Sequence, residues 1–193
     1  MSRHSTLTDP AIHETKGAAT ATAGYILTAT GTGATFQTAS STPSGGLVRS
    51  NIYFSTASAT ATATIPFDNT IPTSGEGFQV MTTTWTPLAV NNRIRILVSS
   101  LVSSSTAAQV STSLFQDANT AALAAAAVKI GTAGDTNQVG LAYEYTATAT
   151  ASTTFNVRVG ASAAATTTFN GSLGTQLFGG VANSYIQVQE YKA

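Results

Sequence analysis

The two histidines of the chain, His4 and His13, are the side chains best suited to proton transfer or metal binding near neutral pH. Both lie within the first 13 residues, close to Asp9 and Glu14, and these four side chains could in principle gather around a zinc ion. A nucleophilic serine needs an imidazole that the folded domain holds in place, and residues 14–193 contain no histidine. We therefore expect a solvated or docking segment here rather than a metal site, and no Ser-His catalysis.

The acidic residues are the other candidates for chemistry. Glycoside cleavage needs two carboxyl groups that converge in one groove. The eight Asp and Glu residues are spread thinly along the chain, although sequence distance does not forbid convergence. The sequence has no G-x-S-x-G elbow, no EF-hand spacing and no glycine-rich phosphate loop. It also has no cysteine, which excludes disulfides and thiolate metal sites. We expect no catalytic, cofactor-binding or metal-binding residues, and thus no enzyme.

Charge is scarce in this chain. Charged residues make up 8% of it, against about 25% in a typical soluble domain, and Ala, Ser and Thr take their place. This composition predicts a surface of small hydroxyl and methyl groups, with little charge repulsion to keep copies apart. The net charge is zero and no run of Lys or Arg exists, so we expect no nucleic-acid partner. An assembled protein fits these numbers better than a free monomer.

The sequence predicts neither a membrane-spanning segment nor a secretory signal. The N-terminal residues 1–10 have no apolar core and do not predict a secretory signal. The longest apolar run, residues 121–128, is far shorter than the ~20 residues that span a bilayer. We therefore expect no membrane partner.

The elements that must position any functional residue fall into three regions. Residues 1–23 carry both histidines and a small charge cluster, and we interpret them as an extended N-terminal docking arm. Residues 24–46 are rich in Gly, Thr and Ser and predict a linker or extended segment. Residues 47–193 read as a succession of strands separated by turn residues.

Several of these strands alternate between apolar and polar residues, so each has one core face and one wetter face. The clearest alternation is at 92–98, 141–145, 155–159 and 185–191, and further strands are expected at 49–55, 59–65, 78–86, 107–115 and 121–130. Many short strands of this kind predict an all-β fold, an antiparallel β-sandwich or jelly roll.

Three details of this fold can be checked. Residues 121–129 have the strongest helix propensity of the chain, but the turn residues around them favour a strand, with a helix as the alternative. A hairpin with residues 150–152 as its loop would place Glu144 opposite Arg158. Tyr185 and Tyr191 could contact a sugar, but packing in the core or at a subunit interface is the simpler interpretation.

The segment from Asp9 to Ala18 reads D-P-A-I-H-E-T-K-G-A, and A-T-A-T-A-G-Y follows it. This run resembles an N-terminal signature of small bacteriophage virion proteins. The stretches 85–96, 113–117, 156–160 and 177–181 are similar to β-knob domains of phage fibres and head decorations, which have a jelly roll like that of tumour necrosis factor and C1q. The resemblance covers residues 9–25 and about 78–191.

This resemblance implies a homotrimer located on the virion. It also implies that an extended N-terminus grips another virion protein, which makes His13, Glu14 and Lys16 the candidate docking contacts. We therefore expect a trimeric capsid decoration or head-fibre protein, with phage capsid protein as its partner. The alternative is a tail-associated fibre or adhesin, attached to a tail protein, whose knob binds a host surface glycan.

Overall fold

The computed structural model describes residues 25–29, 34–38 and 44–193. The chain divides into two compact units, 1–43 and 44–193. In the first unit, β1 (Tyr25–Ala29) pairs antiparallel with β2 (Ala34–Thr38), where the sequence predicted a linker or extended segment. The predicted docking arm, residues 1–23, lies outside the described residues.

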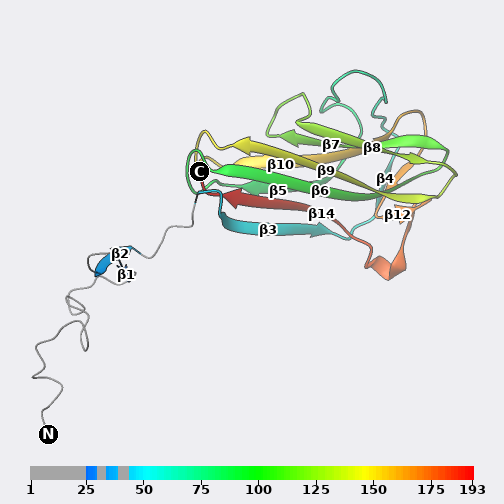
Figure 1. Ribbon diagram of the computed structural model, residues 1–193. Coiled ribbons are helices and arrows are strands. Elements are labelled where there is room, and N and C mark those ends of the chain that lie inside the picture. The colour runs from blue at the N-terminus through cyan, green and yellow to red at the C-terminus, as the bar shows by residue number, and fades with distance from the viewer. Residues whose placement is uncertain (1–24, 30–33, 39–43) are drawn as a thin grey trace, which may run out of the picture. The chain divides into compact units, whose positions relative to one another are not determined.

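The second unit is a sandwich of two antiparallel sheets (Figure 1). The small sheet has the strand order β5-β10-β7-β8. Its strands are β5 (Phe78–Trp85), β10 (Thr153–Ala161), β7 (Ala108–Gln116) and β8 (Ala124–Ile130).

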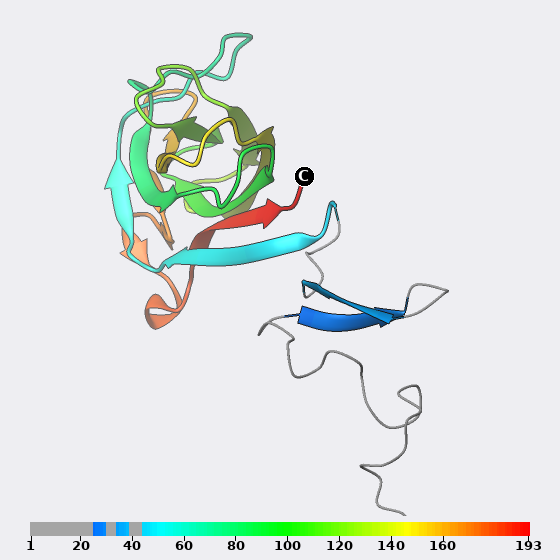
Figure 2. The ribbon, with the colours of Figure 1, turned by 90° about the vertical axis from the view of Figure 1, so that its left-hand side faces the viewer.

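The large sheet has β3, β14 and β6 side by side, and β6 pairs along its other edge with β9. Viewed along the strands, β3 (cyan) runs beside β14 (red) (Figure 2). Near its end β6 pairs with β11, which in turn pairs with β4. The strands of this sheet are β3 (Leu47–Ser55), β14 (Ser184–Tyr191), β6 (Arg93–Ser104), β9 (Thr136–Thr146), β11 (Thr167–Phe169) and β4 (Ala59–Ala61).

The connections between the sheets define the topology. Along the chain, β3, β6, β9 and β14 of the large sheet alternate with members of the small sheet, so neighbours within a sheet are distant in sequence. This arrangement is that of a jelly roll, and it confirms the predicted all-β, antiparallel fold class. The remaining elements are β12 (Gly171–Ser172), β13 (Thr175–Gln176) and the 3-10 turn η3 (Phe178–Gly180).

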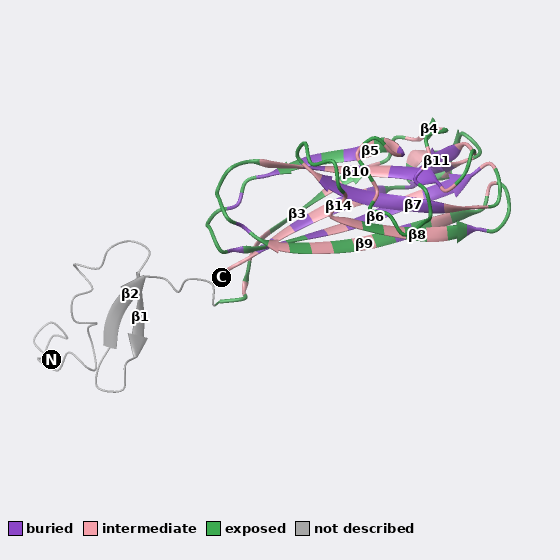
Figure 3. Cartoon of the chain, turned by 90° about the horizontal axis from the view of Figure 1, so that it is seen from above, coloured by how far each residue is buried: buried purple, intermediate pink, exposed green. Residues whose placement is uncertain are grey.

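The core lies between the sheets and comes from the predicted alternation. Ile94, Ile96 and Val98 of β6 are buried, and they face buried residues of β7 and β10 such as Leu114 and Phe155. Figure 3 shows the two faces as alternating burial classes along β9. Each such side chain contributes roughly 1.5–3 kcal/mol when it leaves water, so this interior supplies the main stabilisation of the sandwich.

The hydroxyl groups predicted for the surface are found inside as well. Ser100, Ser104, Thr112 and Thr167 are fully buried. Among the described residues, Ser100 Oγ, Thr112 Oγ1 and Thr167 Oγ1 have no hydrogen-bond partner. Burial of an unpaired hydroxyl costs free energy, so this part of the interior contributes less stability than the aliphatic part.

Each strand predicted after residue 47 has a counterpart, although β4 covers only 59–61 of the predicted 59–65 and β8 only 124–130 of the predicted 121–130. Residues 124–130 form β8, with Val128 opposite Val110 of β7, which confirms the strand and excludes the helix. Alternate residues of β8 face inward, and Ile130 is fully buried.

The predicted pairing of Glu144 with Arg158 is wrong. Glu144 lies on β9 in the large sheet, whereas Arg158 lies on β10 in the small sheet. The loop between these strands crosses from one sheet to the other and closes no hairpin. Glu144 instead lies opposite Arg95 of β6, and its Oε1 is 3.4 Å from Nη1 of Arg93.

Candidate functional site

None of the predicted docking contacts can be placed, because His13, Glu14 and Lys16 lie outside the described residues. Over 25–29, 34–38 and 44–193, no group of three or more His, Cys, Asp or Glu side chains could hold a metal ion. In the same ranges, no helix has the length and apolar character to cross a membrane. The functional features of the second unit are a buried ion pair, an exposed sheet face and a polar recess.

The buried ion pair joins the first and last strands of the second unit. Glu190 of β14 is fully buried, and its Oε2 accepts a hydrogen bond from Nε of Arg49 on β3 at 3.0 Å. Its Oε1 accepts hydrogen bonds from the Leu88 backbone N–H and from Nδ2 of Asn92, each at 2.7 Å. The Arg49 guanidinium lies over the Trp85 ring, 3.9 Å from its centroid. Both carboxylate oxygens are thus occupied by protein donors.

Electrostatics keep this carboxylate ionised. Burial by itself raises the pKa of Glu190. The hydrogen bonds from Asn92, Leu88 and Arg49, together with the Arg49 charge, lower the pKa by more than burial raises it. The pKa of Glu190 therefore lies below its ordinary value. A carboxylate that is ionised and fully paired is a structural anchor and not a proton-transfer group, and it ties together β3, β14 and residues 86–92.

The exposed sheet face is the outward side of β3, β14, β6 and β9, which we call the outer face of the large sheet. Because facing residues of an antiparallel pair point to the same side, the register defines rows across the strands. The rows are Phe54–Tyr185–Ser99–Gly140, Ile52–Gln187–Leu97–Ala142 and Ser50–Gln189–Arg95–Glu144.

One end of this outer face is largely apolar. Phe54 is 64% exposed and Ile52 is 41% exposed, and the Phe54 ring meets that of Tyr185 edge-on at 6.1 Å between centroids. On β9, the exposed residues Gly140 and Ala142 carry almost no side chain. Large apolar groups beside small ones leave room for another surface to approach closely.

Charged residues border the apolar end. Arg93 and Glu144 form an ion pair in which both side chains are exposed, and Arg95 lies directly opposite Glu144 on β6. These three residues, with Ala142 and Tyr143, line a shallow hollow of about 470 Å³. An apolar centre with aromatic side chains, bordered by arginines and polar groups, is the usual composition of a protein–protein interface.

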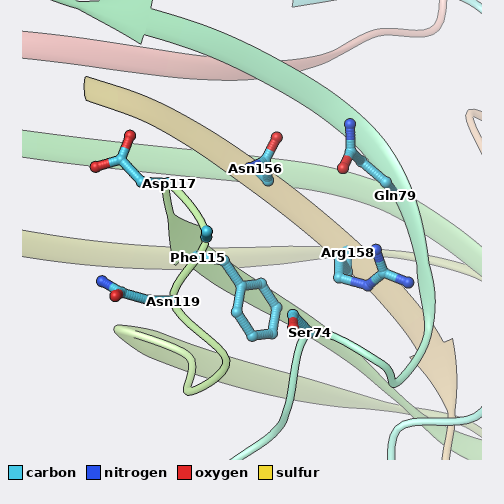
Figure 4. Close-up of a pocket in the computed structure, with 8 residues that line it drawn as sticks. Ser74, Gln79, Phe115, Asp117, Asn119, Asn156 and Arg158 are labelled. Atoms are coloured by element: carbon cyan, nitrogen blue, oxygen red, sulfur yellow. The ribbon is translucent and has the colours of Figure 1, made fainter. Parts of the chain in front are cut away.

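The polar recess lies on the opposite side of the sandwich, on the outward side of the small sheet (Figure 4). It has a volume of about 180 Å³. Its lining is Ser74, Gln79, Phe115, Asp117, Ala118, Asn119, Asn156 and Arg158. The sequence placed Asn156 and Arg158 on the wetter side of their strand. The sequence did not indicate that residues near 74 and 117 surround Asn156 and Arg158, because this arrangement depends on how two loops pack against each other.

Tyr185 and Tyr191, for which the sequence favoured packing over a sugar contact, are not among the residues that line this recess. Both are half-buried on the outer face of the large sheet. Tyr185 packs against Phe54, and the Tyr191 ring lies 5.6 Å from the Arg93 guanidinium. Their contacts are with neighbouring strands of the same sheet, which agrees with the packing interpretation.

No protein-family model matches this sequence, and no curated protein matches it. Among solved structures, the C-terminal domain of EclA, a sugar-binding protein, aligns at 17% identity over 59% of this chain and 74% of its own, with a TM-score of 0.33. Eiger TNF from S. frugiperda aligns at 12% identity over 70% of this chain and 87% of its own, with a TM-score of 0.38.

A phage protein is also among the similar structures. The enzymatically active domain of bacteriophage CBA120 tailspike protein 4 aligns at 12% identity over 65% of this chain and 19% of its own, with a TM-score of 0.26. Likenesses as distant as these do not assign a function. The fold assignment therefore depends on the strand order, and a functional assignment must depend on the surfaces described above.

Proposed function

We propose that this chain is a non-enzymatic structural protein of a bacteriophage virion. It decorates the capsid as a homotrimer, and residues 1–23 bind capsid protein through His13, Glu14 and Lys16. The observation that carries the proposal is the outer face of the large sheet, whose apolar end is suited to burial against a second copy of the chain.

The physical case for assembly starts from exposure. Phe54 and Ile52 are large apolar side chains that lie side by side on an edge strand, and leaving them in water forfeits about 25 cal/mol for each Å² of apolar surface. A homo-oligomer removes that cost once per subunit, because closed symmetry presents the same surfaces in every copy. The low content of charged residues, 8%, leaves little repulsion against such contacts.

The first residues of the second unit are hydrogen-bonded to its C-terminal end, which suits a domain that is attached through its N-terminal segment. Gly45 N–H donates to the carbonyl of Lys192, and Lys192 N–H donates to the carbonyl of Gly46. A few residues later Arg49 binds the buried Glu190. A mechanical force that pulls on residue 44 would therefore have to break the pairing of β3 with β14 before it could disrupt the rest of the core.

A binding assay with capsids that lack this protein tests the anchoring step. The full-length triple variant His13→Ala, Glu14→Gln, Lys16→Ala should lose capsid co-sedimentation by tenfold or more, while the fluorescence of Trp85 stays unchanged. The matched control, Lys129→Ala on exposed β8, should bind as the wild type does. Undiminished binding of the triple variant would refute the arm as anchor.

The second candidate is a tail-associated fibre or adhesin that binds a host surface glycan. The polar recess on the small sheet favours it, because capsid decoration needs no such site. Gold-labelled antibody against the protein separates the two locations on imaged particles. Label over the head supports capsid decoration, label at the tail supports the adhesin, and no label on any particle contradicts both.

A further inference from the structure

The recess on the small sheet is built from three adjacent strands. Asn156 of β10 lies opposite Phe115 of β7, and Arg158 lies opposite Gln79 of β5. The four side chains therefore form a compact group on one side of the sheet (Figure 4). Phe115 is buried and forms the floor, while the other three side chains carry polar groups above it.

The wall of the recess is fixed by backbone hydrogen bonds between two loops. Ser74 N–H donates to the carbonyl of Thr120 at 2.8 Å, and Ala122 N–H donates to the carbonyl of Pro72 at 2.9 Å. Two loops held to each other in this way keep the side chains of the recess in place before any ligand arrives, which reduces the entropy lost on binding.

Asp117 is held at one end of the recess. Its backbone N–H donates to the carbonyl of Thr154, its Oδ1 accepts from the Thr154 N–H at 2.7 Å, and its φ of 51° turns the chain sharply. Oδ2 of Asp117 makes no hydrogen bond within the described residues, so it can accept one from a ligand hydroxyl. Asn119 lies beside it (Figure 4).

Arg158 lies at the other end, and no carboxylate of residues 44–193 forms an ion pair with it. Its Nε donates to the carbonyl of Glu76 at 2.7 Å and its Nη2 to that of Gly77 at 2.8 Å. Both partners are neutral carbonyls, and neither of the ion pairs found in the described residues includes Arg158. The guanidinium is therefore oriented by the protein but still has N–H groups and a full positive charge to offer an anion.

The groups between these ends are amides. Asn156 uses its Oδ1 to accept from the Thr82 hydroxyl at 2.9 Å, which leaves its Nδ2 as a donor, and Gln79 is exposed beside it. The recess thus has a carboxylate acceptor at one end, amide groups in the middle and a cation at the other end. Its small volume and polar lining do not suit an apolar ligand.

We propose that this recess binds one acidic sugar residue of a glycan. The sugar carboxylate would pair with Arg158, and ring hydroxyls would bond to Asn156 and Asp117. The proposal goes beyond capsid decoration and deepens the second candidate function, because it assigns the class of glycan to this recess. It needs neither the N-terminal arm nor assembly. Loss of capsid binding and loss of sugar binding are therefore separate outcomes.

Calorimetric titration of the full chain tests this site, with D-glucuronate as the probe and D-glucose as its neutral counterpart. Glucuronate should bind with a dissociation constant on the order of 1 mM, since a single ring makes few contacts. Glucose should bind at least tenfold more weakly. Equal binding of the two sugars, or no glucuronate binding at tenfold higher concentration, would overturn the proposal.

Variants locate the binding. Asn156→Ala and Gln79→Ala should each weaken glucuronate binding by fivefold or more. The matched control Gln138→Ala changes an exposed strand glutamine of the large sheet and should leave it unchanged. Arg158→Gln should remove the preference for glucuronate over glucose, with a melting curve to show that the protein is folded. If folded Asn156→Ala and Arg158→Gln bind as the wild type does, the sugar binds elsewhere and the assignment is wrong.

Discussion

Arg49 and Glu190 are 141 positions apart in the sequence, and Nε of Arg49 lies 3.0 Å from Oε2 of Glu190. Arg49 lies on β3, the first strand of the second unit, and Glu190 lies on β14, its last strand. The Arg49 guanidinium lies over the Trp85 ring, so the pair joins both ends of the second unit to the end of β5.

Replacing the buried carboxylate should destabilise the whole second unit. Glu190→Gln removes the charge and turns one acceptor into a donor that faces Asn92, Leu88 and Arg49. We expect the free energy of unfolding to fall by about 2–3 kcal/mol. Urea unfolding followed by Trp85 fluorescence measures it. Asp135→Asn, which changes an exposed carboxylate in the turn after β8, is the control and should cost no more than about 1 kcal/mol; equal effects of the two changes would contradict the anchor role.

The same carboxylate predicts acid sensitivity. The folded-state pKa of Glu190 lies below 4.5, its ordinary value. A lowered pKa means that the stabilisation is fully present above pH 4.5 and is lost as the pH falls through the folded-state pKa. The stability difference between wild type and Glu190→Gln should therefore be constant from pH 5 to 7 and shrink below about pH 4.5. A difference that does not change down to pH 3 would show that Glu190 contributes no such linkage.

Gly77 should be intolerant of a side chain. Its φ is +59°, and a Cβ there would lie 2.6 Å from the carbonyl oxygen of Val159 and 2.8 Å from the Ile65 side chain. Gly77→Ala should cost about 2–3 kcal/mol of stability by combining backbone strain with overpacking. Gly179→Ala is the matched control, because its φ is +63° with open space around it, and it should cost about 1 kcal/mol. Thermal melting of both variants measures the two losses of stability. Similar losses would mean that the close contacts at Gly77 are easily relieved.

Strand positions and the fold class could be predicted because alternation is a local signal. For Glu190, this local signal predicted the face on which the side chain lies but not its partner. Its spacing from Ile186 and Val188 placed it on their face, which is the buried one. Its partner Arg49 could not be found, because a contact across the whole length of the chain depends on which strands become neighbours.

The wrong pairing of Glu144 with Arg158 has the same cause. Strands β9 and β10 follow each other in sequence, and a hairpin is the simplest connection for such neighbours. In a jelly roll the chain changes sheet between them, so β9 pairs with β6 and β10 with β5 and β7. The recess was missed for a related reason, since its wall comes from two loops whose contact no periodicity records.

The mass of the full-length protein in solution tests the proposed assembly most directly. Light scattering should give about 59 kDa, three times the 19.6 kDa of one chain. Ala142→Glu puts a charged side chain on the outer face of the large sheet and should give the mass of one chain, with a cooperative melting curve that shows the single chain to be folded. Ala127→Glu, on exposed β8 of the small sheet, should stay at the trimer mass. A wild-type protein that remains at 19.6 kDa, or a trimer that Ala142→Glu leaves intact, would contradict assembly through this face.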